Sequence, residues 1–553
     1  MKKSFYIFAC AHLFSLNFLN AESSLEILQK KAGQLLWVGY HSLDQIKNIQ
    51  PSGVVFYGWN SDDSKQLKKT IQNLRTLEKE KTVKFLTAID HEGGKVQRIK
   101  KGLSFIPDAS ALAATKDTEL VEKISFLMSR ELADLGVDIN FAPVMDRGDS
   151  LNFLANRVWG EDGEVITRMT QAFINGHLRG GTFPFPKHFP GHGMNAFQDA
   201  HFLPIINPES KVSLLDQDLL PFKKVIEDPR LAGMMSAHVE ISSMDHKPAS
   251  LSKKIMTEFL RKELGYEGFI LSDDLEMTAA REGNMNLNEL VIESLKAGVD
   301  AVLIVWSKKG QLQARDQIVQ ALQSGELSEE EIDLKISRLQ KLQTKISKNQ
   351  NESLKLASYS SKEKNELLDQ AWTASQEWIL GSESTFRQWS KPLEHKKWNV
   401  IVPPGSYAKT WKSFRPQDSI HIHDHRKGEN QALLSLTEKK LSQQTPIVIL
   451  TPPLHQDAGQ WVKGLTRLLN AAYQAPSTKA PILWAHMGSK PVRVPRIENP
   501  KKIMSLLLLH SDTDTSLRHF MTMLSSEAQT WKSVSPKYYS LLPLPSWSWD
   551  LKN

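Results

Sequence analysis

The chain has 553 residues, of which 40% are hydrophobic and 24% charged, and its formal net charge is +7. This length exceeds one ordinary core and indicates two domains, while the composition is that of a globular protein and not of a disordered one. The positive charge is small for this length and the Lys/Arg runs are short, so we expect no nucleic-acid partner.

Residues 1–21 have the order of a secretory signal peptide. Lys2 and Lys3 precede an apolar run over 5–18, which is too short to span a membrane, and Ala21 offers a cleavage site. We therefore expect an exported protein, periplasmic or extracellular, with no transmembrane segment. A lipoprotein anchored through Cys10, the only cysteine, is disfavoured because the apolar run before it is very short. The mature chain would then have no disulfide and no thiol chemistry.

Between residues 22 and 345, short apolar runs alternate with helix-length segments, which is typical of βα units around a parallel sheet. Eight strands are predicted, at 35–40, 53–58, 84–90, 137–144, 182–188, 232–238, 268–273 and 299–306. Eight strands in roughly three hundred residues fit a (β/α)8 barrel of the TIM type. An open, doubly wound sheet would show the same alternation and stays the alternative.

The second half of the chain predicts a further α/β domain. Residues 346–370 are rich in Lys, Ser, Asn and Glu and predict a linker or a linking helix. Five more strands, at 398–402, 419–423, 446–450, 481–486 and 503–510, alternate with helix-length segments. They predict that 371–553 form a smaller, sandwich-like α/β domain.

Polar residues gather directly after the barrel strands. They lie at 90–98, 140–146, 187–193, 199–201, 237–238 and 272–274. Barrel enzymes hold their active sites at the carboxyl ends of the strands, and unpaired buried charge is costly. A shared polar cavity at this edge is therefore the simpler explanation.

Asp273 ends a predicted strand and is placed as the carboxylate that attacks an anomeric carbon in retaining glycoside hydrolysis. The alternative role, a helix N-cap before Leu275, suits Asp274 better. No glutamate stands out as the proton donor. Asp199 and His201 are two residues apart, close enough for the carboxylate to hold one imidazole nitrogen and leave the other for proton transfer.

Metal binding is the rival interpretation of the histidines. His188 and His192 have the i, i+4 spacing of zinc helices, with His201 and Asp199 as further metal-type residues. The proline and glycine between His188 and His192 prevent a regular helix from presenting both on one face. We therefore expect no metal.

Three further residues, Asp90, Arg98 and Arg157, suit either sugar hydroxyls or an ion-pair lattice that holds the loops. Lys187 and His188 are adjacent at a strand end. In a regular strand they would point to opposite faces, so that only one of them would face inward unless a bulge intervenes.

Five strings resemble the β-N-acetylglucosaminidase branch of glycoside hydrolase family 3. They are DHEGGKVQR at 90–98, INFAPVMD at 139–146, KHFPGHG at 187–193, DAH at 199–201 and ILSDDLEM at 270–277. The resemblance implies a two-step retaining mechanism through a glycosyl-enzyme ester. In it, Asp273 is the nucleophile and His201, oriented by Asp199, is the acid/base.

The same resemblance implies that Asp90, Arg98, Arg157, Lys187 and His188 hold the N-acetylglucosamine ring, without metal or organic cofactor. The signal peptide and the second domain resemble the exported, two-domain type. The sequence departs from the family pattern at His91, where glutamine is common, and at Lys95, where arginine is common.

The predicted function is that of a retaining exo-β-N-acetylhexosaminidase, acting as a monomer on a carbohydrate. It would remove terminal β-linked N-acetylglucosamine from peptidoglycan-derived fragments or chitooligosaccharides. One alternative is a phosphorylase, because a histidine acid/base avoids the repulsion that a second carboxylate would exert on phosphate. Another is a non-catalytic wall-binding barrel, against which the joint presence of Asp199, His201 and Asp273 argues.

Overall fold

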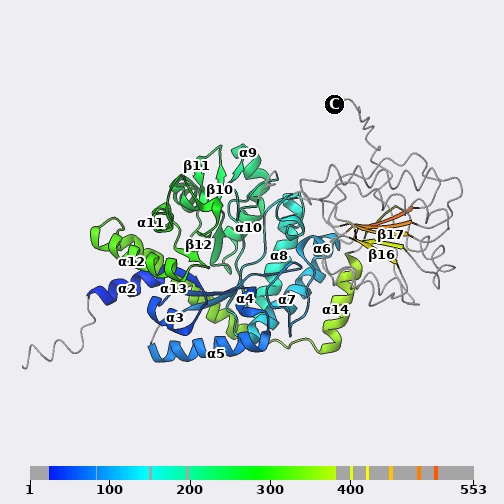
Figure 1. Cartoon of the computed structure of the whole chain (residues 1–553), viewed down its shortest axis with the longest axis horizontal. Coiled ribbons are helices and arrows are strands. Elements are labelled where there is room, and N and C mark those ends of the chain that lie inside the picture. The colour runs from blue at the N-terminus through cyan, green and yellow to red at the C-terminus, as the bar shows by residue number, and fades with distance from the viewer. Residues whose placement is uncertain are drawn as a thin grey trace, which may run out of the picture.

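The computed structural model of the protein describes residues 24–81, 84–148, 152–194, 199–208 and 210–375, and six strands between residues 377 and 508. Eight parallel strands form the first sheet (Figure 1), and each overlaps one of the eight predicted strands. They are β1 (Leu36–Gly39), β2 (Gly53–Phe56), β3 (Leu86–Ile89), β6 (Ile139–Asn140), β7 (Phe183–Pro184), β9 (Gly233–Ser236), β12 (Phe269–Asp274) and β13 (Ala301–Ile304).

The first sheet closes on itself. Its order is β7-β6-β3-β2-β1-β13-β12-β9, so β7 and β9 stand at its two ends. The chain that follows β7 joins them. The Phe189 amide donates to the Met235 carbonyl at 2.9 Å, and the Phe189 carbonyl accepts from the Ala237 amide at 2.7 Å. The closure confirms the (β/α)8 barrel and excludes an open sheet.

Helices surround this sheet (Figure 1). The α-helices are α2 (Ser24–Gln34), α3 (Leu43–Ile49), α4 (Gly58–Ser61), α5 (Ser64–Lys81), α6 (Ala109–Ala114), α7 (Thr118–Leu135), α8 (Gly163–Gly180), α9 (Lys211–Ser213), α10 (Leu220–Glu227), α11 (Leu287–Ala297), α12 (Lys308–Ser324), α13 (Glu329–Ser353) and α14 (Ser361–Ala374). The 3-10 helices are η1 (Ala155–Arg157), η3 (Ala249–Leu251) and η5 (Thr278–Ala280), and the π-helices are η2 (Leu214–Asp218) and η4 (Lys254–Glu263).

Local signals in the sequence set the bounds of these helices. The Asp117 side chain accepts a hydrogen bond from the Leu120 amide and begins α7. Gly136 ends the same helix with φ of 90°, a left-handed conformation that glycine adopts without steric cost. Gly298 ends α11 in the same way, with φ of 116°. Each of these glycines turns the chain from a helix into the next barrel strand.

Two small sheets lie at the carboxyl edge of the barrel. One is the hairpin of β4 (His91–Gly93) and β5 (Val96–Gln97), which directly follows β3. The other joins β8 (Ile205–Asn207), β10 (Val239–Ile241) and β11 (Asp245–Pro248).

The second large sheet has six strands in the order β14-β19-β18-β17-β15-β16. Its parallel strands confirm the five predicted ones: β15 (Asn399–Val402), β16 (Ser419–Ile422), β17 (Ile447–Thr451), β18 (Ile482–His486) and β19 (Met504–Leu508). The sixth strand, β14 (Glu377–Leu380), pairs antiparallel with β19 and was not predicted.

The segment predicted to link the two domains, 346–370, contains the end of α13 and most of α14. The boundaries at 22–345, 346–370 and 371–553 stay a prediction. The predicted signal peptide, 1–21 with Cys10, lies outside the described residues. Among the helices that the structure describes, none combines the length and the apolar character needed to cross a bilayer.

A single tryptophan fills the middle of the barrel. Trp37 on β1 is fully buried, and its ring centroid lies 6.0, 6.3 and 6.1 Å from those of Phe141, Phe185 and Phe269. Phe141 and Phe185 directly follow β6 and β7, and Phe269 begins β12, so the indole packs against residues from three other parts of the sheet. A Cβ on Gly53 would lie 2.1 Å from the Trp37 ring, so the glycine on β2 makes room for it.

Trp37→Ala should destabilise the barrel severely, because it empties the centre of a closed, densely packed core. The free energy of unfolding, measured by denaturant titration, should fall by about 3–5 kcal/mol. Trp37→Phe is the matched control, because it keeps a ring and removes an indole N–H that has no partner among the described residues. An alanine variant no less stable than the phenylalanine variant would contradict this packing.

Candidate active site

The hairpin after β3 brings two carboxylates to the carboxyl edge of the barrel. Asp90 follows β3 directly and Glu92 lies on β4. The turn between β4 and β5 uses Gly93 and Gly94, whose φ values of 101° and 54° favour glycine. A Cβ on Gly94 would also lie 2.3 Å from the Asp108 side chain. The double glycine therefore allows the chain to reverse and to carry Arg98 back toward Asp90.

Lys187 joins this hairpin to the segment after β7, a strand that β6 separates from β3 in the sheet. Its Nζ lies 2.7 Å from Oδ1 of Asp90 and 2.6 Å from Oε1 of Glu92. Arg157 binds Glu92 through two nitrogens, at 2.8 and 2.9 Å. Arg98 completes the network, with Nη2 3.5 Å from Oδ2 of Asp90. We call these five residues the ion-pair network; it holds three cations against two carboxylates.

The network keeps its carboxylates ionised although they are buried. Burial by itself raises the pKa of Glu92, but the Arg157 and Lys187 charges outweigh it and lower that pKa to about 2. Burial likewise opposes ionisation of Asp90, and Lys187 and Arg98 hold its pKa below the ordinary value. Burial lowers the pKa of Lys187, but the two carboxylates raise it overall. All three groups are therefore charged at neutral pH.

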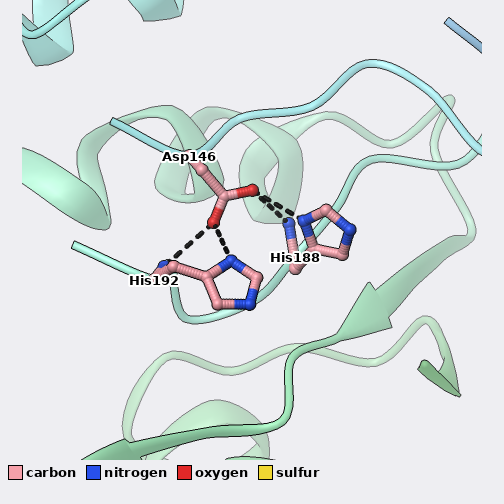
Figure 2. A group of neighbouring side chains, drawn as sticks. All are labelled: Asp146, His188 and His192. Carbon is pink, nitrogen blue, oxygen red and sulfur yellow. Dashed lines mark hydrogen bonds and ion pairs between the residues drawn. The ribbon is translucent and has the colours of Figure 1, made fainter. Parts of the chain in front are cut away.

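Asp146 organises the two histidines of the 187–193 segment (Figure 2). Its Oδ2 accepts from the amide and Nδ1 of His188 at 3.2 and 2.7 Å, and its Oδ1 accepts from the amide and Nδ1 of His192 at 2.9 and 2.8 Å. Burial raises the pKa of Asp146, but the two imidazoles hold it well below the usual range. An ionised carboxylate only accepts, so Nδ1 of each ring carries a proton.

The same three side chains are the group that the structure, over its described residues, brings close enough to hold a metal ion. Asp199 and His201, which the metal interpretation also included, form a separate pair. Each oxygen of Asp146 already accepts from one amide and one imidazole, so hydrogen bonding accounts for the arrangement. A metal bound through the two Nδ1 atoms would have to replace both of their protons.

Lys187 and His188 both face the site. The Lys187 side chain is only 3% exposed within the ion-pair network, and Nε2 of His188 lies 3.9 Å from Oδ2 of Asp273. The expectation that only one of them would face inward was made for a regular strand, and the chain departs from one here. The reason is local: β7 ends at Pro184, so neither residue lies in a regular strand with alternating faces.

Asp273 stands near the end of β12, as predicted, and its side chain is 18% exposed. Burial raises its pKa, but the neighbouring His188 and His238 imidazoles and the Asp274 amide bring it below the ordinary value. That amide donates to Oδ1 of Asp273 at 2.8 Å. His238 is buried and binds the Asp274 carbonyl through Nε2 at 3.1 Å, which fixes the backbone beside the carboxylate.

The predicted N-cap role of Asp274 was wrong, because no helix begins at Leu275. Asp274 closes β12, and its Oδ1 accepts from the Glu276 amide at 3.2 Å. The next helical turn is η5, which starts only at Thr278. Burial and the nearby Glu276 charge raise the pKa of Asp274 well above its usual range. The pKa values of the two adjacent aspartates are thus shifted in opposite directions, downward for Asp273 and upward for Asp274.

Asp199 and His201 form the predicted pair. Nδ1 of His201 lies 2.8 Å from Oδ1 of Asp199, which also accepts from the His201 amide at 2.9 Å. The His201 side chain is 60% exposed. The carbonyls of Ala200 and His201 accept from the amides of Ala279 and Thr278 at 3.1 and 3.4 Å. The pair is therefore docked on the segment that follows the strand of Asp273.

Two residues of this site, Glu92 and Asp146, were not predicted from the sequence. Glu92 connects Lys187 to Arg157, and Asp146 holds both imidazoles. Both residues lie in polar segments that the sequence analysis names, but their distance in sequence from their partners gives no sign that they are in contact. Their partners lie 42 to 95 positions away in the chain, and only the barrel brings them together.

Ionised groups gathered at the carboxyl edge of a (β/α)8 barrel define the site of a barrel enzyme. Residues 27–342 match the model of the glycosyl hydrolase family 3 N-terminal domain. A β-hexosaminidase of Glaesserella parasuis is 34% identical over 268 residues, covering 48% of this chain and 77% of that protein.

Solved structures show the same fold. A family 3 β-N-acetylglucosaminidase from a Paenibacillus species covers 90% of this chain and 96% of its own, with a TM-score of 0.74 and 24% identity. A β-glucoside phosphorylase covers 92% of this chain and 93% of its own, with a TM-score of 0.70 and 18% identity. The chain belongs to glycoside hydrolase family 3, and it is a glycoside hydrolase that acts on a carbohydrate.

Glu92→Gln should destabilise the protein in a pH-dependent way. The folded pKa of Glu92 is about 2 and the unfolded value about 4.3, so the carboxylate contributes stability above pH ~4.3 and loses it as pH falls toward 2. The variant should lose about 3 kcal/mol of unfolding free energy at pH 7, and the difference from wild type should shrink below pH ~4.

Chemical denaturation of both proteins across this pH range measures the difference. Glu119→Gln is the control, because it removes an exposed pair with Lys123 and should change little. A Glu92→Gln deficit that stays constant down to the lowest pH would contradict the linkage.

Asp146→Asn should reverse the tautomer of one or both imidazoles, because its amide group donates where the carboxylate only accepts. Imidazole 15N NMR should show loss of the Nδ1–H form, and hydrolysis of an aryl glycoside should slow by about 10- to 100-fold. Unchanged tautomers with unchanged turnover would show that Asp146 only packs the loop.

Proposed function

We propose that the protein is an exported, retaining exo-β-N-acetylhexosaminidase that removes terminal β-linked N-acetylglucosamine from peptidoglycan-derived fragments or chitooligosaccharides. The observation that carries the proposal is the Asp199–His201 pair, docked on the segment directly after the strand of Asp273. A carboxylate nucleophile and a separate proton donor are what a retaining glycosidase requires.

Asp273 acts first. It is ionised at neutral pH, because the imidazoles of His188 and His238 and a backbone amide favour its charge. Its carboxylate attacks the anomeric carbon and forms a glycosyl ester, while the bond to the leaving oxygen breaks.

His201 supplies the proton for that oxygen. Because Asp199 accepts the Nδ1 proton, the remaining nitrogen Nε2 exchanges the second one. In the second step the neutral imidazole takes a proton from water, which attacks the anomeric carbon and releases Asp273. The high exposure of His201 leaves its outer nitrogen accessible to the leaving group and then to water.

The ion-pair network binds the terminal sugar. Oδ2 of Asp90 has its nearest charged partner, Arg98, only at 3.5 Å, so it remains an acceptor for a sugar hydroxyl. Lys187, Arg157 and Arg98 donate to hydroxyl and acetamide oxygens. Nε2 of His188 lies 3.9 Å from Oδ2 of Asp273, on the Asp273 side of the network.

Export rests on the signal peptide predicted at 1–21, and the monomeric state stays a prediction. The second α/β domain is proposed to shape access to the site, since the barrel residues supply every group that the reaction needs.

The proposal is tested by hydrolysis of an aryl β-N-acetylglucosaminide by the mature protein, with and without phosphate. Asp273→Ala should abolish turnover, and His201→Ala should lower it by about 10²- to 10⁴-fold. His246→Ala is the matched control: it removes another exposed imidazole that a carboxylate holds, with Nδ1 3.0 Å from Glu240, and should leave turnover unchanged.

Each outcome distinguishes the proposed hydrolase from one of its alternatives. Strong stimulation by phosphate would reassign the protein as a phosphorylase. A folded wild type without activity would overturn the enzyme assignment for this substrate and favour wall binding.

A further inference from the structure

Two half-exposed tryptophans stand at the carboxyl edge of the barrel, outside the residues assigned above. Trp59 lies in α4, just after β2, and is 48% exposed; Trp306 follows β13 and is 54% exposed. The strands β2 and β13 both pair with β1, and β13 also pairs with β12, the strand of Asp273. Parallel strands end at one edge, so both rings belong to the edge that carries the site.

Trp306 is connected to the ion-pair network through one ring. Its centroid lies 5.6 Å from that of Tyr57, and the guanidinium of Arg98 lies 5.3 Å from the Tyr57 centroid. Burial, with the charges of Asp90, Asp274 and Asp273, raises the pKa of Tyr57 well above its usual range. Tyr57 thus lies between the charged site and the exposed indole.

The backbone of Trp306 is fixed to the segment that follows Asp273. The amides of Trp306 and Ser307 donate to the two oxygens of Glu276, at 2.5 and 3.0 Å. The pair of Asp199 and His201 docks on Thr278 and Ala279 of the same segment. The tryptophan and the proton donor therefore flank one short stretch of chain.

Trp59 is held just as firmly. Its ring stacks on His41, with centroids 4.8 Å apart and planes at 30°. His41 in turn donates from Nε2 to the Val305 carbonyl at 3.1 Å, next to Trp306. The turn that carries Trp59 is tied to β1 through Asn60, which accepts from the Tyr57 amide and donates to the Tyr40 carbonyl, both at 2.8 Å.

We propose that Trp306 and Trp59, backed by Tyr57 and His41, form an aromatic platform that stacks the sugar residues of the substrate beyond the one cleaved. The proposal rests on the proposed function and names where the rest of the glycan binds. Single exposed aromatic side chains need no explanation, but two that are rigidly held beside a site indicate a binding surface.

The exposed indole rings indicate the chemical class of ligand that the platform binds. Indole rings offer flat apolar faces, which match the C–H faces of β-linked pyranose rings, and rigid rings lose little entropy on binding. The leaving side is assigned because a proton donor must lie at the leaving oxygen, and His201 docks on the same segment as Trp306. The platform would therefore favour N-acetylglucosamine oligosaccharides over substrates without a second ring.

The test compares kcat/KM for the β-1,4-linked trisaccharide of N-acetylglucosamine with that for methyl β-N-acetylglucosaminide, whose leaving group has no ring. In Trp306→Ala the ratio of the two values should fall roughly tenfold, through a rise in KM for the trisaccharide, and Trp59→Ala should lower it less. Trp306→Phe should restore most of the ratio. Leu334→Ala is the control, because it removes a side chain that is 58% exposed on α13.

The outcomes separate the two proposals. A wild type that cleaves neither substrate overturns the proposed function, and the platform with it. A wild type that cleaves both, with a ratio that stays within twofold of its value in both alanine variants, overturns the platform alone.

Discussion

The contact of Lys187 with Asp90 and Glu92 joins the segments that follow β7 and β3, and the site is built around it. The lysine follows β7, whereas both carboxylates follow β3. Burying the charge of a lysine that is 3% exposed is costly unless carboxylates pair with it. The buried carboxylates depend on the lysine charge for the same reason. Arg157 and Arg98 extend the network to the segment before α8 and to the hairpin of β4 and β5. One set of mutual charges thereby fixes the loops after three strands.

Charge is distributed unevenly around Asp273. The ion-pair network holds one more cation than carboxylates, and the neighbouring imidazoles are organised by Asp146. Among the described residues, the nearest basic side chain to Asp273 is that of His188, with Nε2 3.9 Å from Oδ2, so this oxygen stays available for attack while Oδ1 accepts from the Asp274 amide. Asp274, one residue along, has its pKa pushed upward instead. The contrast comes from environment alone, because the two side chains are chemically identical.

Much of the fold could be predicted from the sequence, because it depends on local signals. Apolar runs and the glycines at Gly136 and Gly298 marked the strands and the helix ends. The antiparallel strand β14 was missed, since its pairing with β19 depends on a segment more than 120 positions away. Strand alternation does not apply at Lys187 and His188, because regular strand geometry has already ended at Pro184, an exception that the prediction allowed.

The site was predicted in part, for a related reason. The pair of Asp199 and His201 is local, and the spacing of two residues was enough to expect the contact that the structure has. Glu92 and Asp146 act on residues that are distant in sequence, and their roles appear only once the barrel closes. The tryptophans Trp59 and Trp306 carry no motif, so only their exposure and their place on the barrel edge single them out.

In the proposed mechanism, Asp273 forms a covalent ester with the sugar during turnover. Incubation with an activated fluorosugar analogue of N-acetylglucosamine, followed by peptide mass spectrometry, tests it most directly. We expect one glycosyl adduct, on the peptide that contains Asp273, and none in Asp273→Ala. An adduct on another residue, or turnover of the analogue by the Asp273→Ala variant at the wild-type rate, would contradict it.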